Sequence, residues 1–416
     1  MSTTPPGPAP WRAIAAGASA SFVGIGLARF AYTPLLPEIV NAHWFSPSAV
    51  AYLGSANLAG YLLGALAARR VARRLGDRRA LRWMMALATV GLLACSVPVS
   101  VGWFFAWRLV SGVAGGVIMV RVAGAVLPHL HGQRRGLASG AIFAGLGLGI
   151  AASGTLVPLL LTAGLSSTWI GLAALCALLT APSWNGWPAP TAPSPAAASA
   201  PTPRAERPAR SPRLALLLVE YALISMGIVP AMSFLADFVS RGLGRGSGGG
   251  SLIWIVYGLG ALLGPTLYGL LGDRLGFARA LLLITVVQAA ALTALAFTHA
   301  LPEIAVLSVV IGTLPPGVVP VVLGRVHELV PANTEAQSAA WGRATIAGAL
   351  SLAVSAYLYS YVFDLTGQNH HVLFLIGAAA LALALLTHLA TRFLRPDTER
   401  RPAAAPAPVP AGALSE

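Results

Sequence analysis

Two arginines lie inside long apolar segments, where a charged side chain is costly. Arg29 lies in the run GLARFAYTPLLPEIV, residues 26–40, and Arg108 lies near the start of a later apolar segment. A charge at such depth in a membrane is tolerated when it faces a bundle interior or a water-filled cavity. Because arginine does not give up its proton, each guanidinium would hold an anionic group or pair with a carboxylate. The alternative for both is a place at the outer membrane interface, where the side chain reaches water.

Tyr32 follows Arg29 by about one helical turn, so both side chains share one face of a helix. A cation and a phenol side by side could recognise an anionic or polar substrate, although tyrosine is equally typical of membrane interfaces. Pro34 and Pro37 remove backbone donors just beyond this pair. Because a broken helix inside a membrane is tolerated where it lines a cavity, this stretch is predicted to border a polar path.

Glu220 is the acid whose position is most informative. Of 13 acidic residues it is the one placed clearly within an apolar segment, whereas Asp237 and Glu38 lie near segment ends and are expected to be solvated. A carboxyl group inside a helical bundle can take up and release a proton as access to it alternates. A structural ion pair or a hydrogen bond within the bundle is the alternative role.

Three uncharged polar residues, Asn57, Tyr257 and Gln288, lie in other apolar segments. Each either lines a substrate path or joins neighbouring helices through hydrogen bonds. The two cysteines, Cys95 and Cys176, have no CxxC partner, so we expect neither a disulfide nor a metal site. HExxH, a suitably placed GxSxG and a Walker A motif are also missing from the sequence, so we expect neither an enzyme nor a cofactor.

The elements that must position these residues are membrane-spanning helices. The chain has 416 residues, of which 56% are hydrophobic and 10% are charged, whereas a soluble domain has roughly 25% charged residues. Apolar runs of about 20 residues match the length of a spanning helix. We predict twelve spans, at 12–36, 48–68, 81–100, 102–122, 136–161, 165–182, 214–239, 251–272, 279–298, 302–324, 337–361 and 371–394.

Residues 183–213, rich in Pro, Ala and Ser, divide these spans into two groups of six. Such a stretch cannot bury a core, so it is predicted to be a flexible linker between six-helix bundles at 12–182 and 214–394. The terminal tails, residues 1–11 and 395–416, are predicted to be disordered. Two related bundles that face each other across a central site are typical of transporters.

All 27 basic residues are arginine, and the net charge is +14. They gather between spans 2 and 3, between spans 4 and 5, in the linker and beyond span 12, whereas the other side carries Arg241 and Arg245. Because arginines concentrate in cytoplasmic loops, both termini and the linker are predicted to be cytoplasmic. The sequence shows no basic face on a soluble module, so nucleic-acid binding is not expected.

The loop GLLGDRLG, residues 269–276, resembles the loop signature of the major facilitator superfamily, G-x-L-x-D-R-x-G. The matching residues are Gly269, Leu271, Asp273, Arg274 and Gly276. In the corresponding loop of the first half, Arg69 replaces the first glycine and Arg73 replaces the aspartate. The resemblance implies that these loops gate the cytoplasmic side, with Asp77 as the candidate substitute for the missing acid.

Residues 26–40 are similar to the first span of bacterial YbfB/YjiJ-type facilitators, which carry a G-x-x-R-F-A-Y-T-P-L-L-P run. RLVSGVAGG, residues 108–116, resembles the R-x-x-x-G pattern of the superfamily's fourth span. The resemblance implies an all-α integral membrane protein with twelve transmembrane helices in two six-helix bundles. It further implies a gradient-driven carrier in the bacterial cytoplasmic membrane.

The resulting hypothesis is a proton-coupled carrier that moves a small organic solute by alternating access. Glu220 would carry the proton, and Arg29 and Arg108 would hold the substrate or modulate that carboxyl group. Uptake of an organic anion and drug/proton antiport both fit, and the carrier is expected to act as a monomer in the lipid bilayer. The alternative is a non-transporting sensor or assembly factor that kept the transporter fold, which the degenerate first-half loop favours.

Overall fold

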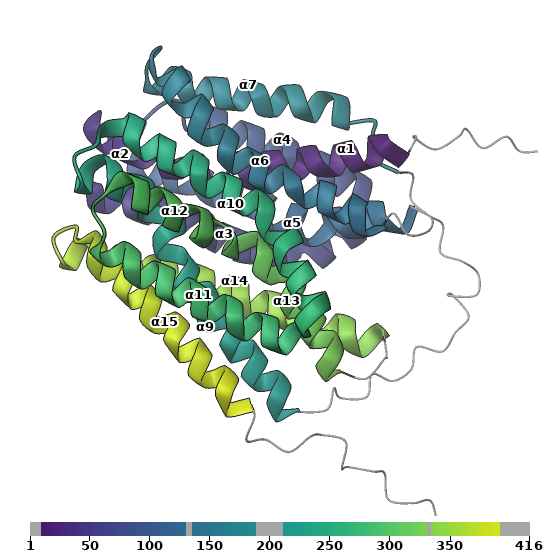
Figure 1. Ribbon diagram of the computed structural model, residues 1–416. Helices are drawn as coiled ribbons and strands as arrows, with labels where there is room; N and C mark the ends of the chain where they lie inside the picture. Colours follow the sequence, from purple (N-terminus) through teal and green to yellow (C-terminus); the bar gives the residue numbers. More distant parts are fainter. Residues whose placement is uncertain (1–9, 130–134, 189–210, 331–333, 392–416) are drawn as a thin grey trace, which may run out of the picture.

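Two groups of helices lie side by side in the structure, a computed structural model that describes residues 10–129, 135–188, 211–330 and 334–391 (Figure 1). Within these residues every regular element is a helix. Most of the predicted linker and of the predicted tails lies outside the described residues, so their disorder stays a prediction.

The first group of helices holds the chain up to Ser183. Its opening span is an apolar segment of 31 residues, Trp11–Asn41, divided into α1 (Pro10–Ser21), the π-helix η1 (Phe22–Leu27) and α2 (Tyr32–Asn41). The helices that follow are α3 (Pro47–Leu75), α4 (Asp77–Ala94), α5 (Val101–Val126) with the short η2 (Leu127–His129), α6 (Arg135–Leu161) and α7 (Leu165–Ser183).

The second group repeats this plan from Pro212 onward. It comprises α9 (Pro212–Asp237) with the π-helix η4 (Phe238–Gly242), α10 (Gly246–Leu275), α11 (Phe277–Phe297), α12 (Leu301–Gly312), α13 (Leu314–Leu329), α14 (Thr334–Leu365) and α15 (His370–Ala390). Helices α12 and α13 together form one apolar span, Leu301–Leu329.

Eleven segments of the described chain are long and apolar enough to cross a bilayer. Helix α4 is not among them, because four of its first six residues are charged: Asp77, Arg78, Arg79 and Arg82. It nevertheless packs against α5 and α7 within the first group. With α4 included, each group has six spans, and the predicted all-α fold of two six-helix bundles is confirmed.

The two groups pack alike at positions that lie 200 residues apart. In each group one helix passes so close to another that a methyl group on a glycine would lie only 2.0–2.2 Å from a carbonyl oxygen. Glycine alone allows this approach, because it has no Cβ atom. Three contacts of the first half have an equivalent in the second half. The contact of Gly60 with Leu109 corresponds to that of Gly260 with Val309, and the contact of Gly64 with Val113 corresponds to that of Gly264 with Thr313. The contact of Gly112 with Asn57 corresponds to that of Gly312 with Tyr257.

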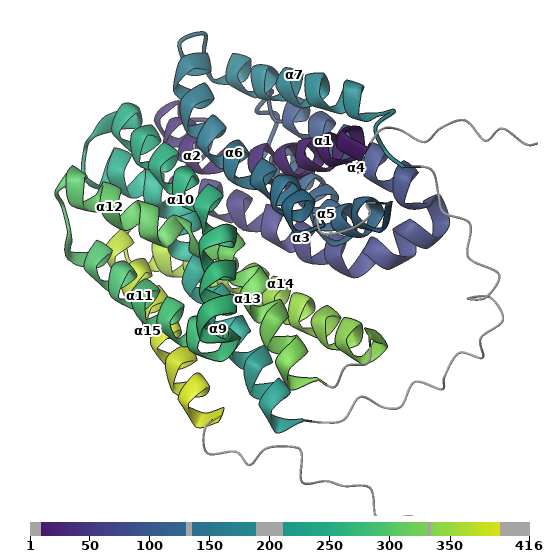
Figure 2. The ribbon, with the colours of Figure 1, turned by 45° about the vertical axis from the view of Figure 1, so that its right-hand side comes forward.

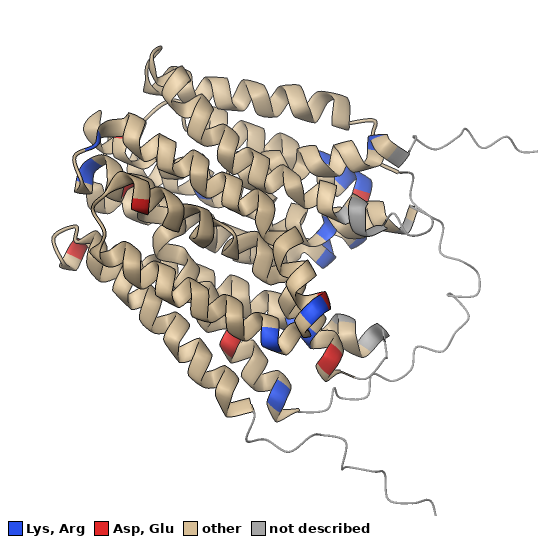
Figure 3. Cartoon of the chain, in the orientation of Figure 1, with Lys and Arg blue, Asp and Glu red and all other residues tan. Residues whose placement is uncertain are grey.

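Charged residues mark one end of the helical bundle. Arginines gather at the end where α3 meets α4 and α10 meets α11, which we call the arginine-rich end (Figure 3). Helix α1 begins and α15 ends toward this side of the molecule (Figure 1). At the opposite end, the turn between α9 and α10 carries Arg241 and Arg245. The arginines predicted between spans 2 and 3 therefore gather at one end, whereas most of those predicted in the linker and beyond span 12 lie outside the described residues.

The two halves meet along three helix pairs, and Figure 2 shows α6 beside α10 and α3 beside α14. Helix α6 packs on α10, α3 packs on α14, and α2 packs on α9. Between α10 and α6, Nε1 of Trp254 donates to Oγ of Ser153 at 3.1 Å. Between α3 and α14, the hydroxyl oxygens of Ser55 and Ser360 lie 2.9 Å apart. Both polar contacts join uncharged groups, so the halves can separate at these points without exposing an unpaired charge.

Candidate functional site

The first span is interrupted where Arg29 projects from it. The chain leaves regular helix at residues 28–31, between η1 and α2. The N–H of Ala28 donates to the Val23 carbonyl at 3.0 Å, the wider spacing of a π-helical turn. Pro34 follows as the third residue of α2, where a helix does not need a backbone donor. The broken helix predicted for this stretch is thus present, and it carries the arginine.

A cavity lies where this interruption faces the second half. Its volume is about 30 Å³, which leaves room for about two water molecules. The first span, α3, α5, α9 and α14 all contribute to its walls, and the polar lining residues are Arg29, Tyr32, Thr33, Ser55, Asn57, Arg108, Ser233 and Ser360. The structure therefore brings four of the predicted site residues together, namely Arg29, Tyr32, Asn57 and Arg108.

Arg108 is held on one side of the cavity by neutral groups. Its residue is 2% exposed, and its Nη1 donates to the Ala28 carbonyl at 2.7 Å. Its guanidinium carbon lies 4.2 Å from the centre of the Tyr32 ring, whose hydroxyl donates to the Val50 carbonyl at 2.7 Å. Asn57 donates through Nδ2 to the backbone carbonyl of Arg108 at 3.1 Å. The Nε atom of Arg108 is buried without a hydrogen-bond partner.

Arg29 has weaker neighbours than Arg108. Its Nη2 donates to the sulfur of Met232 on α9 at 2.9 Å, and a thioether is a weak acceptor. Its guanidinium carbon lies 5.1 Å from the centre of the Phe30 ring and 5.3 Å from that of Tyr61, so both rings offer cation–π contacts. Its Nε is buried without a partner. Within the described part of the chain, neither Arg29 nor Arg108 forms an ion pair.

Several residues of the cavity were not among the predicted ones. Thr33 donates to the Met232 carbonyl at 2.9 Å, which joins the first span to α9 across the two halves. Met232 contacts both Thr33 and Arg29. A hydroxyl or thioether in an apolar helix is too common to be singled out by pattern alone. The signal available for Thr33 was its place in the same broken stretch as Arg29.

Tyr257 and Gln288 are not among the residues that line this cavity, and both belong to the second half. Both border a second, apolar depression that has no room for water and is lined by α9, α10, α11, α12, α13 and α15. Tyr257 stacks on Trp254 with ring centres 4.7 Å apart. Gln288 donates through Nε2 to the Tyr268 hydroxyl at 2.8 Å and to the Val310 carbonyl at 2.7 Å. Gln288 thus joins three helices, which is the alternative role allowed for it by the sequence.

Glu220 also lies apart from the central cavity. It is 2% exposed on α9, and its Oε1 lies 2.8 Å from Nδ1 of His388 on α15. Both helices belong to the second half. The hydrogen bonds and ion pairs of Arg29 and Arg108 do not include Glu220, so these arginines do not contact the carboxyl group that they were expected to modulate.

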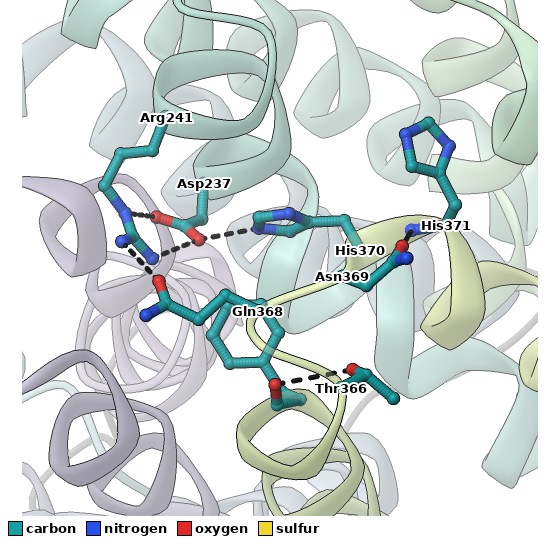
Figure 4. A network of polar contacts seen from close by, with 8 residues as sticks. Asp237, Arg241, Thr366, Gln368, Asn369, His370 and His371 are labelled. Carbon is teal, nitrogen blue, oxygen red and sulfur yellow. Dashed lines mark hydrogen bonds and ion pairs between the residues drawn. The ribbon is translucent and has the colours of Figure 1, made fainter.

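Asp237 is buried rather than solvated, contrary to the prediction. Its residue is 0% exposed, and its Oδ2 lies 2.7 Å from Nε2 of His370 (Figure 4). Arg241, one turn further on, donates to both carboxylate oxygens and also to Oε1 of Gln368 at 3.0 Å. The turn between α14 and α15 covers the acid, which a pattern read along α9 alone could not reveal. Glu38, also expected to be solvated, is half-buried in α2.

The loop that matches the superfamily signature lies at the arginine-rich end. Asp273 and Arg274 are exposed at the end of α10, and a side chain at Gly269 would meet open space. Gly276 has a φ of 79°, a conformation that favours glycine, and its N–H donates to the Gly272 carbonyl at 2.9 Å. The glycine therefore ends α10 and turns the chain into α11.

The corresponding loop of the first half contains an acidic group despite its departure from the signature. Gly76 has a φ of 75° and ends α3 as Gly276 ends α10. Asp77, the first residue of α4, accepts two hydrogen bonds of 2.7 Å from Arg121 on α5. This bidentate ion pair joins two helices of the first half at the arginine-rich end.

Two repeated six-helix groups around a central cavity form the fold of the major facilitator superfamily (MFS), a class of membrane transporters. A solved structure described as the crystal structure of a D-xylose–proton symporter has the same fold, with a TM-score of 0.71 and 14% sequence identity. The alignment covers 92% of this chain and 98% of that chain. No curated protein matches this chain in sequence.

Residues 21–389 match the sequence model of a family described as uncharacterised MFS-type transporter YbfB. The chain belongs to this family, as the run around Arg29 predicted. The protein is therefore a multi-pass membrane protein whose family and fold are those of a transporter rather than an enzyme.

Proposed function

We propose that the protein is a secondary active transporter that binds a small organic anion at the central cavity and moves it by alternating access. The observation that supports this substrate class is the pair of guanidiniums at the cavity, of which Arg108 is buried and Arg29 partly buried. Each has neutral neighbours and a buried Nε without a partner. An anionic ligand would supply both the opposite charge and the missing acceptors.

Binding requires the cavity to widen. A volume of about 30 Å³, which leaves room for about two water molecules, is too small for an organic anion. Thr33 and Met232 close the cavity between the first span and α9. In the proposed cycle the two halves rock about the central site, so that this contact opens toward one side of the membrane at a time.

We further propose that transport is coupled to protons through Glu220. The carboxyl group and His388 form a buried pair that can hold or release a proton between them. His388 also borders an open cavity at the arginine-rich end, which would connect the pair to water on that side. Since Glu220 and Met232 lie on the same helix, a change at the pair can reach the central site through α9.

The proposed location is the bacterial cytoplasmic membrane, with the arginine-rich end and both termini in the cytoplasm. This orientation follows from the tendency of arginine-rich loops to remain cytoplasmic. The carrier is proposed to work as a monomer, because each chain contains both halves of the central site.

A flux assay in proteoliposomes tests these proposals. Purified protein is reconstituted, and uptake of labelled mono- and dicarboxylates is measured with and without an imposed pH gradient, beside matched cationic and neutral solutes. We expect saturable uptake of an anion that is faster with the gradient. Uptake confined to cations would overturn the proposed substrate class, and a rate indifferent to the gradient would overturn proton coupling.

The alternative of a non-transporting sensor or assembly factor depended on the degenerate first-half loop. Because Asp77 supplies an acidic group there and pairs with Arg121, the departure from the signature is a weaker argument against transport. Ligand-dependent thermal stabilisation together with no flux in either direction would favour the sensor.

A further inference from the structure

An unpaired hydrogen-bond acceptor belongs to the central cavity, together with its two guanidiniums. Asn57 lines this cavity from α3 and is 2% exposed. Its Nδ2 donates to the backbone carbonyl of Arg108 at 3.1 Å, whereas its Oδ1 is buried without a hydrogen-bond partner. The reverse orientation of the amide is unfavourable, because Oδ1 would then face a carbonyl oxygen and neither atom could donate. Asn57 therefore provides an acceptor at a site where Arg29 and Arg108 provide donors.

The neighbouring donors of the protein do not satisfy this oxygen. Four hydroxyl groups of the cavity form their hydrogen bonds with other groups, and they belong to Tyr32, Thr33, Ser55 and Ser360. The Nε atoms of Arg29 and Arg108 are themselves buried without partners. Buried polar atoms are nearly always hydrogen-bonded, so three unpaired ones at a single cavity indicate a ligand that complements them. Such a ligand offers acceptors to the guanidiniums and a donor to Asn57.

The charge of the cavity decides which kind of donor the ligand carries. An ammonium group would be repelled by the two guanidiniums, and the described lining of the cavity contains no acidic residue to balance it. A hydroxyl group is neutral, and it can donate to Oδ1 of Asn57 while it accepts from an N–H of a guanidinium. The donor that fits this site is therefore a hydroxyl group.

We propose that the transported anion is a hydroxycarboxylate and that Asn57 selects it through its hydroxyl group, an inference that rests on the proposed anion transport. The carboxylate contacts the guanidiniums of Arg29 and Arg108, and the hydroxyl group donates to Oδ1 of Asn57. A site that hydrogen-bonds a substrate hydroxyl discriminates against the analogue that lacks it, because the buried partner is then left unpaired. Asn57 thus joins α3 to α5 through Nδ2 and reads the substrate through Oδ1.

Calorimetric titration of the purified full-length protein with matched ligands tests this selection. Lactate is compared with propanoate, and malate with succinate, because the members of each pair differ by one hydroxyl group. We expect the hydroxylated member of a pair to bind about five- to tenfold more tightly. Alanine carries an ammonium group where lactate carries its hydroxyl, and we expect it to bind more weakly than lactate.

The outcomes separate this inference from the proposed function. Equal affinities within both pairs would overturn the selection of a hydroxyl group and leave anion transport intact. Tighter binding of alanine than of lactate would assign Oδ1 of Asn57 to an ammonium group and overturn the proposal. Failure of all four carboxylates to bind would also overturn it, and the flux assay then decides separately whether another anion is carried.

Matched variants connect the preference to Asn57. Asn57→Leu removes the amide at similar volume, so lactate and propanoate should then bind about equally, with propanoate still held by the guanidiniums. Asn57→Ala serves the same purpose if the leucine variant does not fold. Ser360→Ala is the control, because this cavity hydroxyl already donates to the Ala356 carbonyl at 2.8 Å and its loss should keep the preference. A preference that persists without the Asn57 amide, or that disappears in Ser360→Ala, would overturn the assignment.

Discussion

Arg108 lies with its guanidinium carbon 4.2 Å from the centre of the Tyr32 ring, while its Nη1 donates to the Ala28 carbonyl. Ala28 is the first residue of the stretch where the first span leaves regular helix, and Tyr32 begins α2 directly after it. Arg108 therefore brings a charge into the cavity and also holds the interrupted backbone from which Arg29 projects. A change at Arg108 should reach Arg29 through that backbone.

Arg108→Lys keeps the charge but removes the planar group that lies against Tyr32 and donates to Ala28. We expect the affinity for the anion to fall about tenfold or more, because a charge-assisted hydrogen bond contributes about 1.5–3 kcal/mol. The unfolding midpoint should fall as well, since the contact with the first span is lost. Binding titrations and thermal unfolding measure the two effects. Wild-type affinity in an Arg108→Gln variant would falsify the assigned role.

Arg29→Gln should separate binding from stability. The guanidinium of Arg29 contacts a thioether and two aromatic rings, so its removal takes away a partly buried charge without breaking an ion pair. We expect anion affinity to drop about tenfold or more, with an unfolding midpoint equal to or above that of the wild type. Arg245→Gln, at the turn before α10, is the matched control. A large loss of stability in Arg29→Gln would contradict this prediction.

The two buried acids of α9 should differ in function. Glu220 and Asp237 lie about 25 Å apart along the helix, given a rise of about 1.5 Å per residue, and each contacts a histidine of α15. Glu220→Gln should abolish the response of uptake to a pH gradient while leaving exchange of substrate across the membrane. Asp237→Asn should keep that response but lower the unfolding midpoint, because Arg241 loses its ion pair. If Asp237→Asn removed the response of uptake to the pH gradient, proton coupling would be assigned to Asp237 instead of Glu220.

Close helix approach in the first half can be tested with a pair of glycines on α5. A methyl group at Gly112 would lie 2.0 Å from the carbonyl oxygen of Asn57, whereas at Gly124 it would meet open space. Gly112→Ala should therefore destabilise the protein by about 1–3 kcal/mol. Gly124→Ala should be neutral or stabilising, because alanine favours a helix more than glycine does. Equal unfolding midpoints for the two variants would show that α3 and α5 adjust without cost.

The helical plan and part of the cavity could be predicted from the sequence because they depend on local properties. Apolar length decides where a span lies, and a charge within a span indicates a polar interior. Arg29, Tyr32 and Arg108 were found in this way, and the structure places all three at one cavity. Helix α4 is the span that is not apolar enough to be recognised by length and composition, because arginines occupy its first turns.

The remaining parts of the site depend on contacts between distant segments. Asp237 lies near the end of a span, and only the turn that carries Gln368 and His370 makes its surroundings buried. Gln288 faces Tyr268 and Val310 rather than the central cavity, and the composition of its own helix does not reveal that face. The partners of Glu220 were likewise hidden, because His388 follows it by 168 residues.

Both guanidiniums of the central cavity belong to the first half, while the second half contributes the thioether of Met232 and the hydroxyls of Ser233 and Ser360. A bound anion would accordingly stay paired with the two guanidiniums and move together with the first half. When the halves part, the bonds that break are those to neutral groups, and no ion pair between substrate and protein needs to be pulled apart. The activation barrier for reorientation would then be nearly independent of the charge that the substrate carries.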